Sequence, residues 1–359
     1  MNKKYIFILT LFIFCGIINA QNKIIPFNDP NLLYEGRTLY RPDAAELIWS
    51  AASVSICFEG TGISAVMRDL DTANYYNVFI DGKYLTKFHT DTVKHSYLLA
   101  SGLTAGKHTA ELFKRTEWDR GKTLFYGFEA DENTKVLPMQ QTKKRKMEFF
   151  GNSITCGYAN EDSAGTDAWV GYFQDAYKSY ASITARHFNA QCHFTSRSGI
   201  GIMVSWAPLI MPEMYDRTDP TDSTSKWDFS KYTPDIVVIN LYQNDSWLVN
   251  SPDNDQFKSR FGTKAPDEAY IINAYKNFVT TIRSKYPQAY IICALGSMDA
   301  TKEGSKWPGY IQKAVEQMGD KKIYTHFFSF INANRHPIAK EHEEMAQSLI
   351  KFIEENIKW

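Results

Sequence analysis

The hydrophobic pattern of this chain changes near Lys146, and that change limits the folds open to it. Before Lys146, short apolar stretches typical of β-strands are separated by glycine-containing turns. After Lys146, buried strands alternate with helical patterns, which indicates a parallel sheet between helical layers. We therefore expect an all-β jelly-roll sandwich over residues 21–137, a linker over residues 138–146, and a three-layer α/β/α domain over residues 147–359.

The N-terminal part of the chain shows no helical pattern before residue 137. Asp81-Gly82 stands between two apolar runs and is a strong signal for a β-hairpin. Short strands at this spacing are typical of a β-sandwich of the jelly-roll type. The strands that we expect here are Val54–Phe58, Ile63–Met67, Tyr75–Ile80, Lys83–His89, His95–Ala100, His108–Phe113 and Leu124–Glu129.

The C-terminal part alternates strands and helices. The expected strands are Met147–Phe150, Ala190–Thr195, Asp235–Leu241, Ala289–Leu295 and Ile323–Phe330. The expected helices are Trp169–Phe188, Asp267–Tyr286, Lys306–Met318 and Ile338–Ile357, the last of them started by Pro337. In parallel sheets of this kind, active sites gather at the carboxyl ends of the strands.

Residues 1–20 have the features of an export signal. A positively charged start is followed by an apolar run from Tyr5 to Ile18 and by a small-residue cleavage site after Ala20. Cys15 follows Phe14, where a lipoprotein signal needs a small residue, so simple export is the better interpretation. The apolar run is too short for a membrane span, and we expect a periplasmic or extracellular protein.

Composition excludes some functions. The formal net charge is zero, which gives no electrostatic basis for binding nucleic acid or an anionic membrane surface. The basic run from Lys143 to Lys146 is interpreted as a solvated linker. Aromatic residues make up 14% of the chain; they suit sugar stacking or a β-rich core, and the core is the favoured interpretation. The oligomeric state stays open.

The cysteines predict no metal site. Cys57, Cys156, Cys192 and Cys293 remain after the signal, and their spacing matches no zinc motif. We expect four unpaired, mostly buried thiols, with a disulfide between Cys156 and Cys192 as the alternative in an oxidising compartment. No metal and no cofactor is expected.

Four polar segments each follow a different predicted strand. They are Gly151-Asn152-Ser153, Ser198-Gly199-Ile200-Gly201, Tyr242-Gln243-Asn244-Asp245 and Asn334-Arg335-His336-Pro337. Each segment alone also fits an ordinary turn. A serine flanked by backbone N–H groups at the end of a buried strand is nevertheless a candidate nucleophile, and the joint order of the four segments is much less expected by chance.

These segments resemble the four conserved blocks of the SGNH hydrolase superfamily, named for its serine, glycine, asparagine and histidine. The sandwich placed before them is similar to that of carbohydrate esterase family 2. The resemblance covers nearly the whole mature chain. It rests on Phe58-Glu59-Gly60-Thr61-Gly62-Ile63, Val78-Phe79-Ile80-Asp81-Gly82, Gly106-Lys107-His108, Lys114-Arg115-Thr116-Glu117, Gly151-Asn152-Ser153-Ile154-Thr155-Cys156-Gly157-Tyr158 and Ser198-Gly199-Ile200-Gly201-Ile202.

The resemblance implies roles for individual residues. Ser153 would be the nucleophile and His336 the general base. The N–H groups of Ser153 and Gly199, with the side-chain amide of Asn244, would form the oxyanion hole. A serine hydroxyl needs such a base, and fixed N–H donors stabilise the oxyanion of ester cleavage. Candidate substrate contacts are Tyr242, Trp206 and Trp247.

The chain departs from the superfamily pattern at three places. Asn152 replaces the common Asp, and Tyr242-Gln243 replaces Gly-Thr, which brings a bulky ring near the expected pocket. The acid that usually stands three residues before the histidine is replaced by Ala333. We therefore expect a Ser–His dyad, with no carboxylate in hydrogen-bond reach of His336 Nδ1 and a backbone carbonyl orienting the ring.

Two classes of function remain open. The favoured one is an exported carbohydrate O-deacetylase that acts on acetylated polysaccharide or oligosaccharide through an acyl-enzyme. The alternative is a catalytically weak or inactive carbohydrate-binding protein, for which Ala333 and Tyr242 would be marks of decay. The short, charged linker without a Gly/Ser tract also predicts that the sandwich packs tightly on the second domain.

Overall fold

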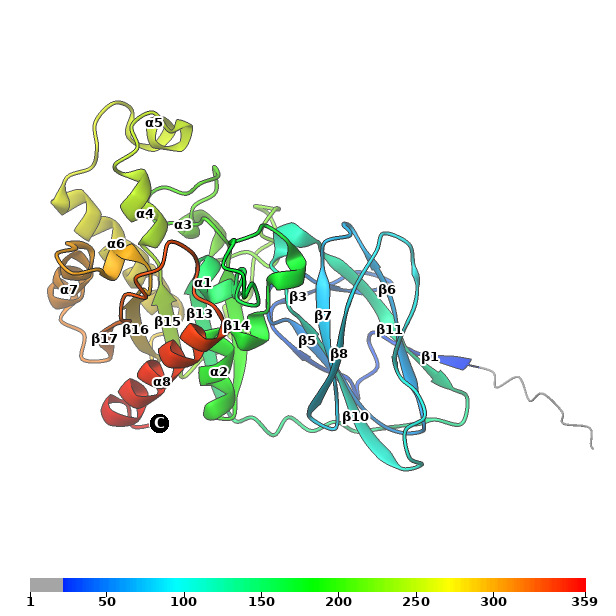
Figure 1. The fold of residues 1–359 in the computed structure, drawn as a ribbon. Coiled ribbons are helices and arrows are strands. Elements are labelled where there is room, and N and C mark those ends of the chain that lie inside the picture. Colours follow the sequence, from blue (N-terminus) through cyan, green and yellow to red (C-terminus); the bar gives the residue numbers. More distant parts are fainter. Residues whose placement is uncertain (1–21) are drawn as a thin grey trace, which may run out of the picture.

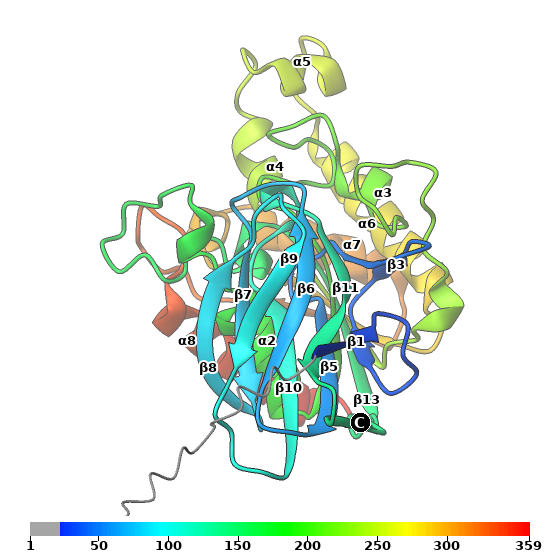
Figure 2. The same ribbon diagram turned by 90° about the vertical axis from the view of Figure 1, so that its right-hand side faces the viewer.

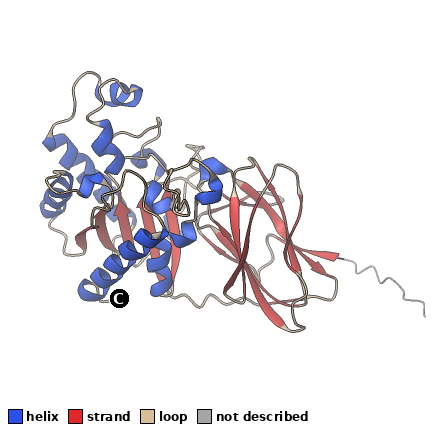
Figure 3. Ribbon diagram, viewed as in Figure 1, coloured by secondary structure: helices blue, strands red, loops and turns tan. Residues whose placement is uncertain are grey.

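The computed structural model describes residues 22–359, which form two units lying side by side (Figure 1). Antiparallel strands make up the N-terminal unit, and the C-terminal unit combines a parallel sheet with helices (Figure 3). This architecture confirms the fold class expected from the sequence. The predicted export signal lies outside the described residues. Within residues 22–359, no helix has the length and hydropathy of a membrane span.

The N-terminal unit is a sandwich of two six-stranded antiparallel sheets (Figure 2). One sheet contains β1 (Asn22–Pro26), β3 (Thr38–Tyr40), β4 (Ala45–Leu47), β6 (Ile63–Asp69), β9 (His95–Ala100) and β11 (Thr123–Asp131). The other contains β2 (Leu33–Glu35), β5 (Ser53–Glu59), β7 (Tyr75–Ile80), β8 (Lys83–His89), β10 (Lys107–Lys114) and β12 (Lys135–Leu137). The strands predicted from Val54 onward are all present.

The sequence pattern explains why these strands form a sandwich. In β6, buried and partly exposed residues alternate, so that Ala65 and Met67 face the core between the sheets. Asp81 and Gly82 both adopt positive φ, at 51° and 72°, and join β7 to β8 in the predicted hairpin.

The C-terminal unit is built on a five-stranded parallel sheet with the order β14-β13-β15-β16-β17. Its strands are β13 (Arg145–Gly151), β14 (Ala190–Ser196), β15 (Ile236–Asn240), β16 (Tyr290–Leu295) and β17 (Ile323–Phe327). Strand β13 pairs in parallel with both β14 and β15, and this places the Ser153 segment between the carboxyl ends of those two strands.

Helices cover both faces of the parallel sheet. In β15, Val237 and Ile239 pack into the cluster that contains α6 (Glu268–Lys285) and α7 (Trp307–Met318). The alternate residues Ile236 and Val238 pack into the cluster on the opposite face, which contains α2 (Tyr180–His187) and α8 (Ala339–Asn356). An unbroken apolar strand is the expected result of burial on both faces.

Shorter helices occupy the loops. The α-helical ones are α1 (Ser153–Cys156), α3 (Met211–Met214), α4 (Gln243–Leu248) and α5 (Asp255–Phe261). The 3₁₀ turns are η1 (Trp118–Arg120), η2 (Gly171–Phe173), η3 (Ala176–Lys178), η4 (Phe229–Lys231) and η5 (Asp299–Thr301).

The predicted helix over Trp169–Phe188 is wrong in its first half. Only Tyr180–His187 is α-helical, and Val170 is extended. Asp175 and Ser179 each use the side chain to cap a new helical segment, accepting from Tyr177 N and Ser182 N. Side chains that bind nearby backbone in this way interrupt a continuous helix.

The two units pack tightly, as the short linker predicted. Ile48 and Trp49 of the sandwich belong to one core cluster of the second domain, and Phe79 and Phe113 belong to the other. Arg37 enters the second domain and forms a fully buried ion pair of 2.8 Å with Glu148 of β13. The expectation of four unpaired cysteine thiols is also confirmed, so the alternative Cys156–Cys192 disulfide is not formed.

Candidate active site

The strand ends bring the predicted site residues to one edge of the sheet. Gly151, the last residue of β13, pairs with Ser196 on one side and with Asn240 on the other. A Cβ at Gly151 would lie 2.0 Å from Thr155 Oγ1, so only glycine lets the chain turn tightly into α1. The Asn152 side chain then caps α1 by accepting from Ile154 N, and Ser153 becomes its first residue.

Ser153 and His336 meet at this edge although 183 positions separate them. The Ser153 Oγ lies 2.8 Å from His336 Nε2, which is hydrogen-bond distance for proton transfer from the hydroxyl to the ring. Ser153 is 6% exposed, so the hydroxyl opens to the surface only through a pocket.

The expected Ser–His dyad is wrong, because a carboxylate stands behind His336. Asp167 Oδ1 and Oδ2 lie 2.9 and 2.8 Å from His336 Nδ1, and Oδ1 also accepts from the His336 backbone N–H at 3.2 Å. Burial raises the pKa of Asp167, but the hydrogen bonds and charge of His336 outweigh burial and hold that pKa below its usual value. An ionised Asp167 accepts from Nδ1–H and so leaves Nε2 as the proton acceptor.

Asp167 comes from the loop after α1 and not from the histidine segment. It adopts a positive φ of 56°, a conformation in which aspartate is enriched. Nearby, Asp162 accepts from Thr166 Oγ1 at 2.7 Å and from the Ala164 backbone at 3.1 Å. From the sequence, the acid was expected only at the position of Ala333. The loop directly after the serine segment carries several carboxylates, and this was the available signal that the acid could come from there.

The predicted oxyanion donors line the same pocket as Ser153. This pocket of about 380 Å³ includes Ser153, Gly199, Asn244 and His336. The Asn244 amide donates to Ile200 O at 2.8 Å, which fixes its orientation and leaves its second N–H free for another acceptor. Gly199 has a φ of 76°, a left-handed conformation that favours glycine.

Asp245 holds the Gly199 segment in place. Its buried carboxylate accepts from the backbone N–H groups of Ile202, Met203 and Val204 at distances between 2.7 and 3.2 Å. Burial raises the pKa of Asp245 to about 6, and these N–H groups oppose that rise. Two neighbouring residues therefore build two sides of the pocket: Asn244 lines it directly, and Asp245 holds the segment that carries Gly199.

Two of the three predicted substrate contacts are at the pocket. Trp206 and Trp247 line it, and Trp206 is 53% exposed. Tyr242 is not at the pocket, and that prediction is wrong. Its backbone φ of 84° directs the ring into the core, where it packs on Tyr275 and Trp307 and its hydroxyl donates to Ile271 O.

Sequence reasoning missed several residues that complete the pocket. They are Asp119, Tyr158, Trp169, Arg197, Ser198 and Ala207. The Tyr158 ring packs 4.5 Å from the His336 ring and 5.2 Å from the Trp169 ring, measured between centroids. Tyr158 belongs to the serine segment that the sequence analysis singled out. An aromatic residue so close in sequence to the candidate nucleophile was a signal that its ring lines the pocket.

The sandwich supplies one side of the pocket through η1 and the preceding Glu117. The buried Glu117 carboxylate accepts from the Ser198 backbone N–H at 2.6 Å and from Ser198 Oγ at 2.5 Å. Arg120 stacks on Trp169, with its guanidinium carbon 3.5 Å from the ring centroid. Asp119, between these two anchors, lines the pocket itself. The sandwich therefore forms part of the pocket wall, besides packing on the second domain.

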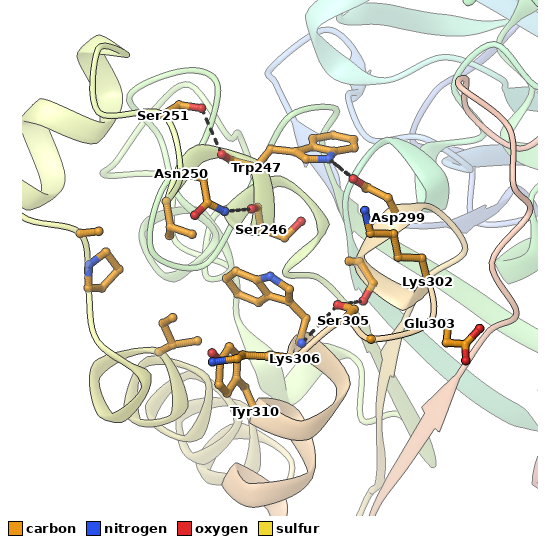
Figure 4. Close-up of a pocket in the computed structure, with 17 residues that line it drawn as sticks. Ser246, Trp247, Asn250, Ser251, Asp299, Lys302, Glu303, Ser305, Lys306 and Tyr310 are labelled. Carbon is orange, nitrogen blue, oxygen red and sulfur yellow. Dashed lines mark hydrogen bonds between the residues drawn. The ribbon is translucent and has the colours of Figure 1, made fainter.

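A second hollow of about 750 Å³ lies beyond Trp247 (Figure 4). Trp247 lines both hollows, and its Nε1 donates to the Asp299 carboxylate at 2.8 and 2.9 Å. The indole therefore forms a fixed wall between them. Within residues 22–359, no group of three or more His, Cys, Asp or Glu side chains is arranged to hold a metal ion.

Comparison with known proteins gives consistent matches. Residues 34–139 match the carbohydrate esterase 2 N-terminal family, and residues 149–348 match the GDSL-like lipase/acylhydrolase family. The cellulase/esterase CelE of Acetivibrio thermocellus is 32% identical over 95% of this chain, and the chain spans only 41% of CelE. An acetylxylan esterase/glucomannan deacetylase of Cellvibrio japonicus is 26% identical, over 95% of this chain and 93% of that protein.

Solved structures agree in fold. A family two carbohydrate esterase from Clostridium thermocellum, solved in complex with cellohexaose, is 33% identical with a TM-score of 0.79. The match covers 90% of this chain and 98% of that one. A family two carbohydrate esterase from Cellvibrio japonicus has the same fold, with a TM-score of 0.82 at 24% identity, over 93% of this chain and 98% of that one.

Proposed function

Because this chain belongs to carbohydrate esterase family 2, a family of carboxylic ester hydrolases, we propose that it is a carbohydrate O-deacetylase. Its substrate is an acetylated polysaccharide or oligosaccharide. The observation that carries the proposal is the hydrogen-bonded series from Ser153 Oγ through His336 to the Asp167 carboxylate, placed in a pocket lined by tryptophans.

The reaction proceeds in two halves through an acetyl-enzyme. In the first, Ser153 Oγ attacks the acetyl carbonyl carbon while His336 Nε2 takes the hydroxyl proton. The tetrahedral intermediate collapses, the C–O bond to the sugar breaks, and His336 returns the proton to the departing sugar oxygen. In the second half, His336 takes a proton from water while the water oxygen attacks the acetyl-serine carbonyl carbon. The bond between that carbon and Ser153 Oγ then breaks, His336 returns the proton to Oγ, and the acetic acid leaves and ionises to acetate.

The oxyanion of each tetrahedral intermediate needs fixed donors. The backbone N–H groups of Ser153 and Gly199 and the free amide N–H of Asn244 are the donors that we assign to it. Asp167 stabilises the imidazolium form of His336 and keeps the ring in its productive orientation.

The inactive-binder alternative loses its two supports. Ala333 no longer marks a missing acid, since Asp167 occupies that role in space. Tyr242 does not narrow the pocket, because its ring is buried on the other side of the chain. Both observations support catalysis.

We also propose the setting of the reaction. Residues 1–20 direct export and are removed after Ala20, leaving a sandwich over residues 21–137, a linker over 138–146 and the hydrolase domain over 147–359. The mature protein acts in the periplasm or outside the cell, where polymeric substrates are found.

The decisive test compares the protein with Ser153→Ala on 4-nitrophenyl acetate and on acetylated xylan, mannan and pectin. We expect acetate release from at least one polymer, and no release by the variant above the uncatalysed rate. Equal rates for the two proteins on all four substrates would refute the proposed function.

A further inference from the structure

Asp119 is a carboxylate in the catalytic pocket with no hydrogen-bond partner among the described residues. It lines the pocket together with Ser153, Trp206 and His336. Its Oδ1 is buried and accepts no hydrogen bond, and no ion pair within 4.0 Å engages the side chain in residues 22–359. Asp119 as a whole is partly buried, and a buried carboxylate oxygen in a folded protein is normally hydrogen-bonded, so the missing partner needs an explanation.

The position of Asp119 is firmly fixed. The residue before η1, Glu117, is tied to Ser198 of the second domain, and Arg120 at the end of η1 stacks on Trp169. Trp118 packs against the core of the second domain, with the Arg197 guanidinium 5.1 Å above its ring. Since its neighbours on both sides are anchored, Asp119 is held at the pocket and does not swing out to water.

The charged surroundings do not satisfy Asp119 either. Burial, followed by the nearby charge of Glu117, raises the pKa of Asp119, while the charges of Arg120, Arg197 and Lys114 oppose the rise. The side chain is therefore a strong acceptor, or a donor when protonated, that faces a pocket and lacks a protein partner. Sugar hydroxyls are the groups in an acetylated carbohydrate that meet this need, because each both donates and accepts.

We propose that Asp119 of the sandwich hydrogen-bonds a free hydroxyl of the sugar that carries the acetyl group, and so selects carbohydrate esters over simple acetate esters. This inference rests on the proposed deacetylase function. Its physical basis is that a hydrogen bond to the Asp119 carboxylate is gained only by substrates that carry a free hydroxyl beside the acetyl group, so these substrates are favoured. The acetyl-transfer chemistry at Ser153 does not require Asp119.

The test compares Asp119→Asn and Asp119→Ala with the unchanged protein on two kinds of substrate. Acetylated xylan or glucomannan offers free hydroxyls, whereas 4-nitrophenyl acetate offers none. We expect kcat/KM on the acetylated polysaccharide to fall about 10- to 100-fold, the range for losing a hydrogen bond to a charged group. On 4-nitrophenyl acetate, kcat/KM should stay within about twofold of the unchanged protein, because no contact is lost.

Two controls separate this role from a structural one. Asp43→Asn removes an exposed carboxylate from the same sandwich and should change neither substrate's kcat/KM. If Asp119 only shapes η1, its loss disturbs Ser198 and Gly199 through Glu117, and kcat/KM falls equally on both substrates. An equal loss on both substrates, or no loss on either, overturns the inference. A failure of the deacetylase proposal is seen separately, as unchanged rates in Ser153→Ala.

Discussion

Asp167 and His336 lie 169 positions apart in the chain, yet the Asp167 carboxylate accepts the Nδ1 hydrogen bond of His336 at 2.8 Å. The acid therefore reaches the histidine from the loop that follows the nucleophile helix, and not from the segment that carries the histidine. That loop also brings Trp169 to the pocket. One loop consequently supplies both the carboxylate bound to His336 and part of the pocket wall.

The first prediction concerns this acid. Asp167→Asn should lower kcat on 4-nitrophenyl acetate by about 10²–10⁴-fold, because an amide neither stabilises the imidazolium nor enforces the productive tautomer. Steady-state kinetics measures the change. The double variant Asp167→Asn/His336→Ala should be no slower than His336→Ala alone, since groups that act as a unit are not additive. If kcat is unchanged in Asp167→Asn, Asp167 has no role in catalysis and Ser153 and His336 act as a dyad.

The second prediction concerns Asn244. Asn244→Ala should lower kcat by about 10²–10³-fold, the range for losing one oxyanion donor. Asn250→Ala is a matched control, because its amide donates to Ser246 O at 2.9 Å and lines only the hollow beyond Trp247. We expect the control to keep its rate on 4-nitrophenyl acetate. If Asn244→Ala has a lower melting temperature but an unchanged kcat per folded molecule, Asn244 serves only as a structural residue.

The third prediction concerns the buried ion pair between the domains. Arg37→Ala leaves the Glu148 carboxylate of β13 buried without its ion-pair partner, and it should reduce the free energy of unfolding by about 3–5 kcal/mol. Urea denaturation measures the loss. Lys306→Ala is the control, because Lys306 pairs with Glu268 at 2.9 Å and the two side chains are 73% and 50% exposed. That control should change the free energy of unfolding little, and a comparable loss in both variants would contradict the prediction.

The fourth prediction concerns pH. Burial raises the pKa of Glu161, but Arg115, Lys178 and Lys87 together outweigh burial and lower it to about 2. Because the folded pKa lies below the ordinary value of 4.5, ionised Glu161 stabilises the fold above that value. The stabilisation is lost as the pH falls toward about 2.

Thermal melting of Glu161→Gln should therefore show a deficit against the unchanged protein at neutral pH that shrinks below about pH 4.5. Glu59→Gln is a suitable control, since Glu59 makes only a long and exposed contact of 3.7 Å with Lys135. A deficit of constant size from pH 7 to pH 3 would show that the loss in Glu161→Gln is not electrostatic.

Local patterns predicted most of the fold. Strand β15 is an uninterrupted run of buried apolar residues, and Asp81-Gly82 adopts the turn that its composition favours. These two features depend on interactions within a few residues. Ser153, Gly199, Asn244 and His336 lie in segments that come after predicted strands, and their roles were predicted from the resemblance of those segments to the SGNH hydrolase superfamily.

The wrong predictions have a common cause. In each of them, contacts between residues far apart in the chain determine the structure. Asp167 lies in a loop that shows no periodic hydrophobic pattern, and its hydrogen-bond partner His336 lies far along the chain. The Tyr242 ring turns away from the pocket because its backbone φ is 84°, which the sequence Tyr-Gln-Asn-Asp does not reveal. The residues before Tyr180 bind the sandwich instead of continuing a helix, as when Ala176 N donates to Arg115 O at 2.9 Å.

The anchoring of η1 through Glu117 and Arg120 has a consequence for how proteins of this design can diverge. Here a short turn of the sandwich forms part of the pocket wall, so substitutions in Glu117–Arg120 are substitutions in the active site. Exchanging the sandwich for that of a relative should therefore change the pocket wall as well as the contacts that hold the two domains together.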